Sequence, residues 1–180
     1  GGGVAHRALK LSNDTLMELE HNSLMIYTSE AHVSGNIHQD ILDSYGMKDS
    51  TTFTALLSLR DAANSMEVAL ECGDMDGYID NLNLSCESLY RLHTSCDSIA
   101  HRKYCYDLED HILGRKTCGA GGGGGMVVYT KPGHRQACML RARELGGEVW
   151  PFTLDYKGVV TWLGKSTSKN FFEKIQSRCR

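Results

Sequence analysis

Apolar positions in the middle of the chain recur at the three- and four-residue spacing of an amphipathic helix. The first such stripe consists of Phe53, Leu56, Ala63, Met66 and Leu70. Gly73 stands just after it, where a glycine commonly ends a helix. The second stripe follows the acidic residues Asp74 and Asp76 and consists of Ile79, Leu82, Cys86, Leu89 and Leu92. We predict two long helices whose stripes form part of the core rather than a cofactor site.

Shorter helices are predicted on both sides of this pair. The four segments are Ser12–Glu20, Ser34–Gly46, His101–His111 and Pro132–Leu145. Ser12, Asn13 or Asp14 is available as the N-cap of the first helix. Pro132 suits the first turn of the last helix, which Gly146-Gly147 closes.

Runs of strand length complete the pattern. The five segments are Leu24–Thr28, Leu113–Cys118, Met126–Thr130, Glu148–Leu154 and Gly158–Leu163. The first is apolar throughout, which predicts a strand buried on both faces. The tight turn Asp155-Tyr156-Lys157 joins the last two into a hairpin. Residues 164–180 are predicted to be a polar tail, in which one amphipathic turn contains Phe171, Phe172 and Ile175.

The order of the elements predicts the fold class. Several helices lie between the first and second strands, and a hairpin spans the glycine-rich segment that follows. This order indicates an α+β sandwich in which helices cover one face of a mainly antiparallel sheet. No internal repeat is present, and we assign residues 1–163 to one domain.

The composition is that of an ordinary globular protein. Of the 180 residues, 41% are hydrophobic and 23% are charged, and there are 2 prolines, so the chain can bury a core. No apolar stretch approaches the roughly 18 residues of a membrane span, and no basic-then-apolar leader is present. We therefore expect a cytoplasmic protein with no membrane partner.

The seven cysteines form no C-x-x-C pair, and the eight histidines form no H-E-x-x-H pattern. Reduced thiols are expected rather than a disulfide framework, and no metal site is expected. Charge is uneven, because residues 131–180 hold 10 Lys and Arg against 4 Asp and Glu, while residues 1–130 hold 9 against 18. The basic end could meet phosphates, or it could be a solvated helix face and tail. Since aromatic and basic residues do not interleave, we expect no nucleic-acid partner.

The segment KTCGAGGGGGMVVYT, residues 116–130, contains six glycines and one alanine in seven consecutive positions. Gly119, Gly121 and Gly124 satisfy G-x-G-x-x-G, but a strand follows where a dinucleotide-binding loop needs a helix. No Gly-Lys-Ser/Thr follows, which excludes a P-loop. Three interpretations stay open: an anion-binding concavity, a loop that leaves room for a ligand or another loop, and a hairpin with a wide bulge.

Residues 116–124 resemble the third motif of the GHMP small-molecule kinases, K-x-x-GAGGGG followed by a strand. Further similarities in the same order lie at Gly2-Gly3, Leu9–Ser12 with Leu19-Glu20, Leu24–Thr28, His32–His38 and Val149–Trp162. The resemblance covers residues 1–163 and is greatest to sugar kinases that act on heptose 7-phosphate or fucose. It implies a ferredoxin-like C-terminal kinase domain.

The resemblance implies transfer of the γ-phosphoryl group of ATP to a small-molecule hydroxyl with the help of magnesium. The family's P-x-S-S-x-G-x-G-S-S phosphate loop and its catalytic aspartate are absent from this chain. We therefore expect the C-terminal half of a sugar or sugar-phosphate kinase, which alone is inactive and binds neither cofactor tightly. Its expected protein partner is a separate N-terminal domain, or a second copy of the chain.

The resemblance also implies the site residues. Gly119, Ala120, Gly121, Gly122, Gly123 and Gly124 would line the cleft beside the phosphoryl group. Ala120 would fit because a larger side chain would crowd that space. Contacts to the substrate are expected from His32, Ser34, His93, Thr94, Ser95 and Lys116, although ordinary surface roles for the histidines and solvation of Lys116 stay open. No catalytic residue and no metal ligand is assigned.

Two other functions are compatible with the same residues. The first is a non-catalytic module that binds a sugar or regulates a partner, which would use the glycine loop for binding alone. The second is a thiol-based enzyme in which Cys118, beside the loop, is the reactive group.

Overall fold

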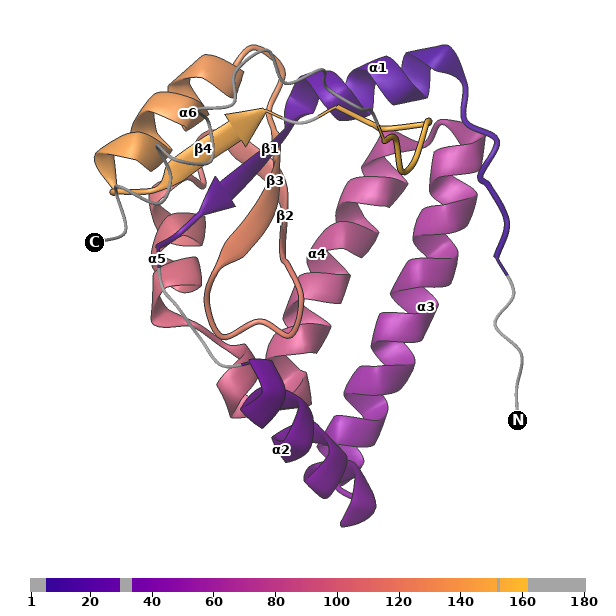
Figure 1. Cartoon of the computed structure of the whole chain (residues 1–180), viewed down its shortest axis with the longest axis vertical. Helices are drawn as coiled ribbons and strands as arrows, with labels where there is room; N and C mark the ends of the chain where they lie inside the picture. Colours follow the sequence, from indigo (N-terminus) through magenta and orange to yellow (C-terminus); the bar gives the residue numbers. More distant parts are fainter. Residues whose placement is uncertain (1–5, 30–33, 152, 162–180) are drawn as a thin grey trace, which may run out of the picture.

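The computed structural model of the chain describes residues 6–29, 34–151 and 153–161 (Figure 1). Its elements are, in order, α1 Asn13–Asn22, β1 Ser23–Tyr27, α2 Ser34–Gly46, α3 Ser50–Cys72, α4 Met75–Leu92, the 3₁₀ turn η1 Thr94–Cys96, α5 Ile99–Asp107, β2 Ile112–Thr117, β3 Gly125–Thr130, α6 Arg135–Glu144 and β4 Glu148–Pro151. Within these ranges no helix is both long and apolar enough to cross a membrane.

The four strands form one antiparallel sheet in the order β2-β3-β1-β4. Strand β1 lies in the interior, with Met25 opposite Val127 of β3 on one side and Trp150 of β4 on the other. The order is that of two interleaved β-α-β units, which defines a ferredoxin-like sandwich. The predicted α+β class and antiparallel sheet are confirmed.

One face of the sheet is covered by α5 and α6. Leu24, Ile26, Met126 and Val128 alternate along the two inner strands and are fully buried. They pack against a cluster from the covering helices that includes Tyr104, Leu108, Cys138 and Ala142. The main core of the domain lies here, because the period-two alternation of these strands presents one apolar row to the helices.

The two predicted long helices are α3 and α4, which lie side by side (Figure 1). Strand β2 runs beside α4, and a Cβ at Gly114 would lie 3.2 Å from a Leu82 methyl carbon, so the glycine permits close approach. On the sheet face away from α5, Tyr129 packs with Leu19, Ile79 and Leu82. The helix pair is thereby fixed to the edge of the sheet.

The helix ends follow from local side chains. Of the three candidate caps, Ser12 is the N-cap of α1, and its Oγ accepts the Thr15 N–H at 3.1 Å. Asp49 and Asp74 cap α3 and α4 in the same way. Gly73 ends α3 with φ +72°, the left-handed conformation expected of a C-cap glycine.

Two predicted helix boundaries were wrong. Helix α5 begins at Ile99 because the Ser98 side chain caps it, and residues 108–111 form turns instead of its last turn. Helix α6 begins at Arg135 rather than at Pro132. Gly133 has φ +77°, which is incompatible with a right-handed helical turn, so Pro132 belongs to the preceding turn.

The predicted closing hairpin was also wrong. Strand β4 ends at Pro151 instead of Leu154, and it pairs with β1. Beyond it, the Leu154 N–H donates to Glu20 Oε1 at 2.7 Å, which directs the chain toward α1. Residues 158–161 are not strand, and the rest of the predicted segment and the tail 164–180 lie outside the described residues.

Candidate functional site

The glycine loop, residues 118–124, joins β2 to β3 as the predicted hairpin connection. Gly119, Gly121, Gly122, Gly123 and Gly124 all have positive φ, between +63° and +149°. Residues with a Cβ rarely adopt these conformations. The run of glycines is therefore required by the path of the main chain.

The loop is held against two other segments. The Gly122 N–H donates to the Cys96 carbonyl at 2.8 Å, and a Cβ built on Gly121 would lie 2.2 Å from the same oxygen. At the other end, the Thr28 N–H and hydroxyl both donate to the Gly124 carbonyl, at 3.0 and 2.9 Å. Contact with η1 therefore leaves no room for a side chain at Gly121.

Ala120 points into the protein rather than along a cleft. It is 6% exposed and packs in a cluster with Ile37, Leu89, Leu92 and Cys96. The small methyl group anchors the loop to α2, α4 and η1. Its role in the structure is packing, and a larger side chain would displace that cluster.

Several backbone donors in the loop have no acceptor among the residues that the structure describes. The N–H groups of Gly121, Gly123 and Gly124 make no hydrogen bond to any part of the chain that the structure describes. These three residues are buried. Buried backbone N–H groups are seldom left unpaired in native proteins, so these donors suit a ligand or ordered water.

A polar cluster from α2 and η1 adjoins the loop. Ser95 Oγ lies 2.5 Å from His93 Nδ1 and donates to Asp40 Oδ2 at 3.1 Å. Its backbone N–H also donates to His93 Nδ1, at 3.2 Å. Because the next residue, Cys96, holds Gly122, two of the predicted residues, His93 and Ser95, are brought to the loop, whereas the neighbouring Thr94 is exposed.

The other predicted residues are placed differently. Lys116 lies on β2 with its Nζ 3.3 Å from the Thr117 carbonyl, and it is half-buried. Ser34 is the first residue of α2, the helix that carries Asp40. His32 lies outside the described residues.

Asp40 was missed by the sequence analysis. A usable signal was its position three residues after the apolar Ile37, because residues three apart share a helix face. Its partner Ser95 lies 55 residues further along the chain. Helical spacing could place Asp40 on the inner face of α2, but it could not identify η1 as the neighbour.

Cys118 lies where β2 enters the loop, with its Sγ 3.9 Å from Met25 Sδ. Burial raises the pKa of the Cys118 thiol above its ordinary value, and the nearby Lys116 ammonium offsets this only in part. A raised pKa disfavours the thiolate, which is the nucleophilic form. These surroundings argue against the thiol-enzyme hypothesis.

The sheet face opposite α5 and α6 keeps an apolar surface, which we call the open face: Met25, Tyr27, Val127 and Trp150. Tyr27 and Trp150 stack with ring centroids 6.0 Å apart and planes 4° from parallel. Trp150 is 51% exposed. Lys116, opposite Val127, borders the same surface.

Known proteins were compared with this chain at the levels of sequence and fold. No protein-family profile matches it, and no curated protein has significant sequence similarity to it. Solved structures with the same fold include a Streptococcus pneumoniae phosphomevalonate kinase in complex with phosphomevalonate and AMPPNP. That enzyme is 24% identical, with a TM-score of 0.57 over 70% of this chain and 37% of the enzyme.

Two further structures are similar in the same way. An L. major mevalonate kinase in complex with R-mevalonate is 15% identical, with a TM-score of 0.61 over 72% of this chain and 41% of the enzyme. A Campylobacter jejuni protein provisionally designated a sugar kinase is 21% identical, with a TM-score of 0.55 over 86% of this chain and 40% of that protein. The fold is therefore one found in GHMP-family kinases, and the chain spans 37–41% of these proteins.

Proposed function

We propose that the chain is the C-terminal, substrate-side half of an ATP-dependent kinase that phosphorylates a sugar or a sugar phosphate. The observation that carries this proposal is that the N–H groups of the buried Gly121, Gly123 and Gly124 have no partner among the described residues. Fixed backbone donors of this kind stabilise phosphate oxygens without having to reorganise. The occurrence of the fold in GHMP-family kinases supports the same assignment.

The polar cluster beside the loop supplies the contacts to the sugar in this proposal. Asp40 holds the Ser95 hydroxyl, and His93 uses its Nδ1 toward Ser95, so the His93 Nε2 is free to meet a sugar hydroxyl. The proposal keeps the substrate contacts predicted for His32 and Ser34, and it adds Thr94 from η1 and Lys116 from β2. Lys116 suits a phosphate because its ammonium is a point charge.

ATP supplies the phosphoryl group when bound, and magnesium offsets the charge on the phosphates. Among the described residues, no group of three His, Cys, Asp or Glu side chains could hold a metal ion. We therefore assign the metal ligands, the adenine contacts and the catalytic base to a separate N-terminal domain. The share of the similar kinases that the chain spans, 37–41%, supports this division.

The proposal is tested by complementation. The polypeptide encoded immediately upstream of codon 1 is produced separately and mixed with the full chain, and ADP release is measured with magnesium, ATP and a panel of sugars and sugar phosphates. We expect turnover that requires both polypeptides and a sugar. The His93→Gln variant should reduce kcat/KM at least tenfold, by about 1.4 kcal/mol or more. Gly46→Ala, on the far end of α2, is the matched control and should leave the rate unchanged.

Two results would count against the kinase assignment. Absence of sugar-dependent turnover in a mixture that forms a complex would overturn it. Saturable binding of a sugar by the isolated chain, with no ATP turnover in any mixture, would favour the non-catalytic binding module instead.

A further inference from the structure

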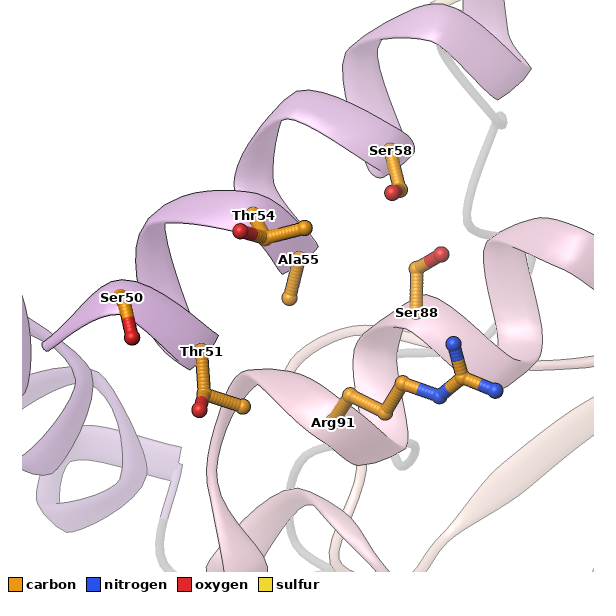
Figure 2. Close-up of a pocket in the computed structure, with 7 residues that line it drawn as sticks. All are labelled: Ser50, Thr51, Thr54, Ala55, Ser58, Ser88 and Arg91. Atoms are coloured by element: carbon orange, nitrogen blue, oxygen red, sulfur yellow. The ribbon is translucent and has the colours of Figure 1, made fainter.

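A cavity of about 320 Å³ lies between the first turns of α3 and the last turns of α4 (Figure 2). Its lining consists of Ser50, Thr51, Thr54, Ala55, Ser58, Ser88 and Arg91. These residues supply five hydroxyl groups and one guanidinium, and none of them is acidic. The volume falls at the lower end of the range of small-molecule sites, about 300–1,000 Å³.

Ser88 is a buried polar group directed into this space. It is 3% exposed, and its hydroxyl has no hydrogen-bond partner in the described part of the chain. Figure 2 shows the side chain projecting from α4 toward Ser58 of α3. Because the hydroxyl lines the cavity, it is a donor available to a ligand there.

Arg91 supplies the charge. It follows Ser88 by three residues and therefore shares its face of α4, and Figure 2 shows the guanidinium lying on the Ser88 side of the cavity. The arginines that form ion pairs with carboxylates are Arg7, Arg60, Arg102, Arg115 and Arg141. The exposed Arg91 has no such partner within residues 6–29, 34–151 and 153–161. Its position in the last turn of α4 is favourable for a cation.

The remaining hydroxyls come from the first turns of α3. Ser50, Thr51 and Thr54 are exposed, so their hydroxyls can turn toward an occupant. The carboxylate of Asp49 is not part of the lining, because its Oδ2 accepts the Thr52 N–H at 2.7 Å as the helix cap. Hydroxyl donors around one unpaired guanidinium, without a carboxylate, suit an oxyanion.

We propose that this cavity binds a phosphate group, either as inorganic phosphate or as the phosphate of a small phosphomonoester. Arg91 provides the charged hydrogen bonds and Ser88 the buried donor. Ala55 both lines the cavity and packs in the cluster that holds Ala120, so the cavity lies beside that cluster. The lining shares no residue with the proposed kinase site, and this proposal does not depend on that function.

The experiment is an NMR titration of the full chain with inorganic phosphate and, separately, with methyl phosphate. We expect saturable amide shifts at residues 50–58 and 88–91. Arg91→Gln should weaken binding at least about tenfold, the effect of losing one charged hydrogen bond, and Ser88→Ala should weaken it by a smaller factor. Arg60→Gln, also an exposed arginine on this helix pair, is the control and should leave the dissociation constant unchanged.

Each outcome decides the proposal. Equal dissociation constants for Arg91→Gln and the parent chain, or no saturable shift at 50–58 and 88–91, would overturn it. Shifts confined to residues 119–124 would also overturn it while leaving the kinase proposal intact. Tighter binding of methyl phosphate than of inorganic phosphate identifies a phosphomonoester as the ligand, whereas the reverse identifies the free ion.

Discussion

At the scale of single residues, the glycine loop shows how backbone conformation constrains composition. Gly121 combines φ +83° with direct contact to the Cys96 carbonyl, whereas Gly119 has φ +63° but open space where a Cβ would lie. The two positions therefore separate the cost of a left-handed residue from the cost of a steric clash. The structure therefore gives a different reason for glycine at each position.

We predict that Gly121→Ala destabilises the fold by about 2–4 kcal/mol, since a left-handed alanine costs about 1–2 kcal/mol and displacement of the Cys96 backbone adds to it. Gly119→Ala should cost only about 1–2 kcal/mol. Urea unfolding of both variants measures the difference. Equal losses of stability would show that η1 moves freely away from the loop.

At the scale of elements, helix ends are decided by single residues with particular backbone angles. Gly73 ends α3 in the left-handed region, with its nearest neighbour, Thr15 Oγ1, 3.4 Å from an added Cβ. Gly46 ends α2 with no positive φ, and no atom lies within 4 Å of an added Cβ. Replacement of glycine by alanine is therefore expected to change the free energy of unfolding in opposite directions at Gly73 and Gly46.

Gly73→Ala should reduce the free energy of unfolding by about 1–2 kcal/mol because alanine is strained in the left-handed region. Gly46→Ala should increase it by about 0.5–1 kcal/mol, since alanine loses less backbone freedom on folding. Thermal unfolding monitored by circular dichroism compares the two. If Gly46→Ala lowered stability as Gly73→Ala does, the end of α2 would have a different backbone conformation from the one drawn in Figure 1.

At the scale of the whole molecule, the sheet has one face covered by α5 and α6 and an open face that carries the stacked Tyr27 and Trp150. Half-exposed aromatic side chains on a sheet are typical of surfaces that meet another protein. The open face borders Lys116 and Cys118, at the start of the glycine loop. It is the surface on which we expect the proposed N-terminal domain to pack.

This expectation is testable by fluorescence in a Trp162→Phe background, where Trp150 is the remaining tryptophan. Addition of the N-terminal polypeptide should shift the Trp150 emission to shorter wavelength, because the ring, now 51% exposed, leaves water. A Trp150→Ala variant should bind the partner more weakly, by about 2 kcal/mol or more if the ring is central to the interface. An unchanged emission spectrum in a mixture shown by sedimentation to form a complex would exclude the open face.

The sequence by itself determined the elements whose signals are local. Apolar spacing predicted α3 and α4, apolar runs predicted the inner strands, and the glycine run predicted a loop without side chains. These features depend on residues close together in the chain. The α+β class followed from their order.

Only the tertiary structure decided which segments meet. Two examples are the contact of Gly121 with Cys96 and the Asp40–Ser95 hydrogen bond, which join residues far apart in the sequence. A third is the path of the chain after Pro151, where Leu154 bonds to the distant Glu20. The cavity beside Arg91 likewise exists because α3 and α4 pack together. Hydrophobic periodicity predicts which side of a helix faces inward. Which segment that side packs against is decided by the free energy of packing with residues distant in the sequence.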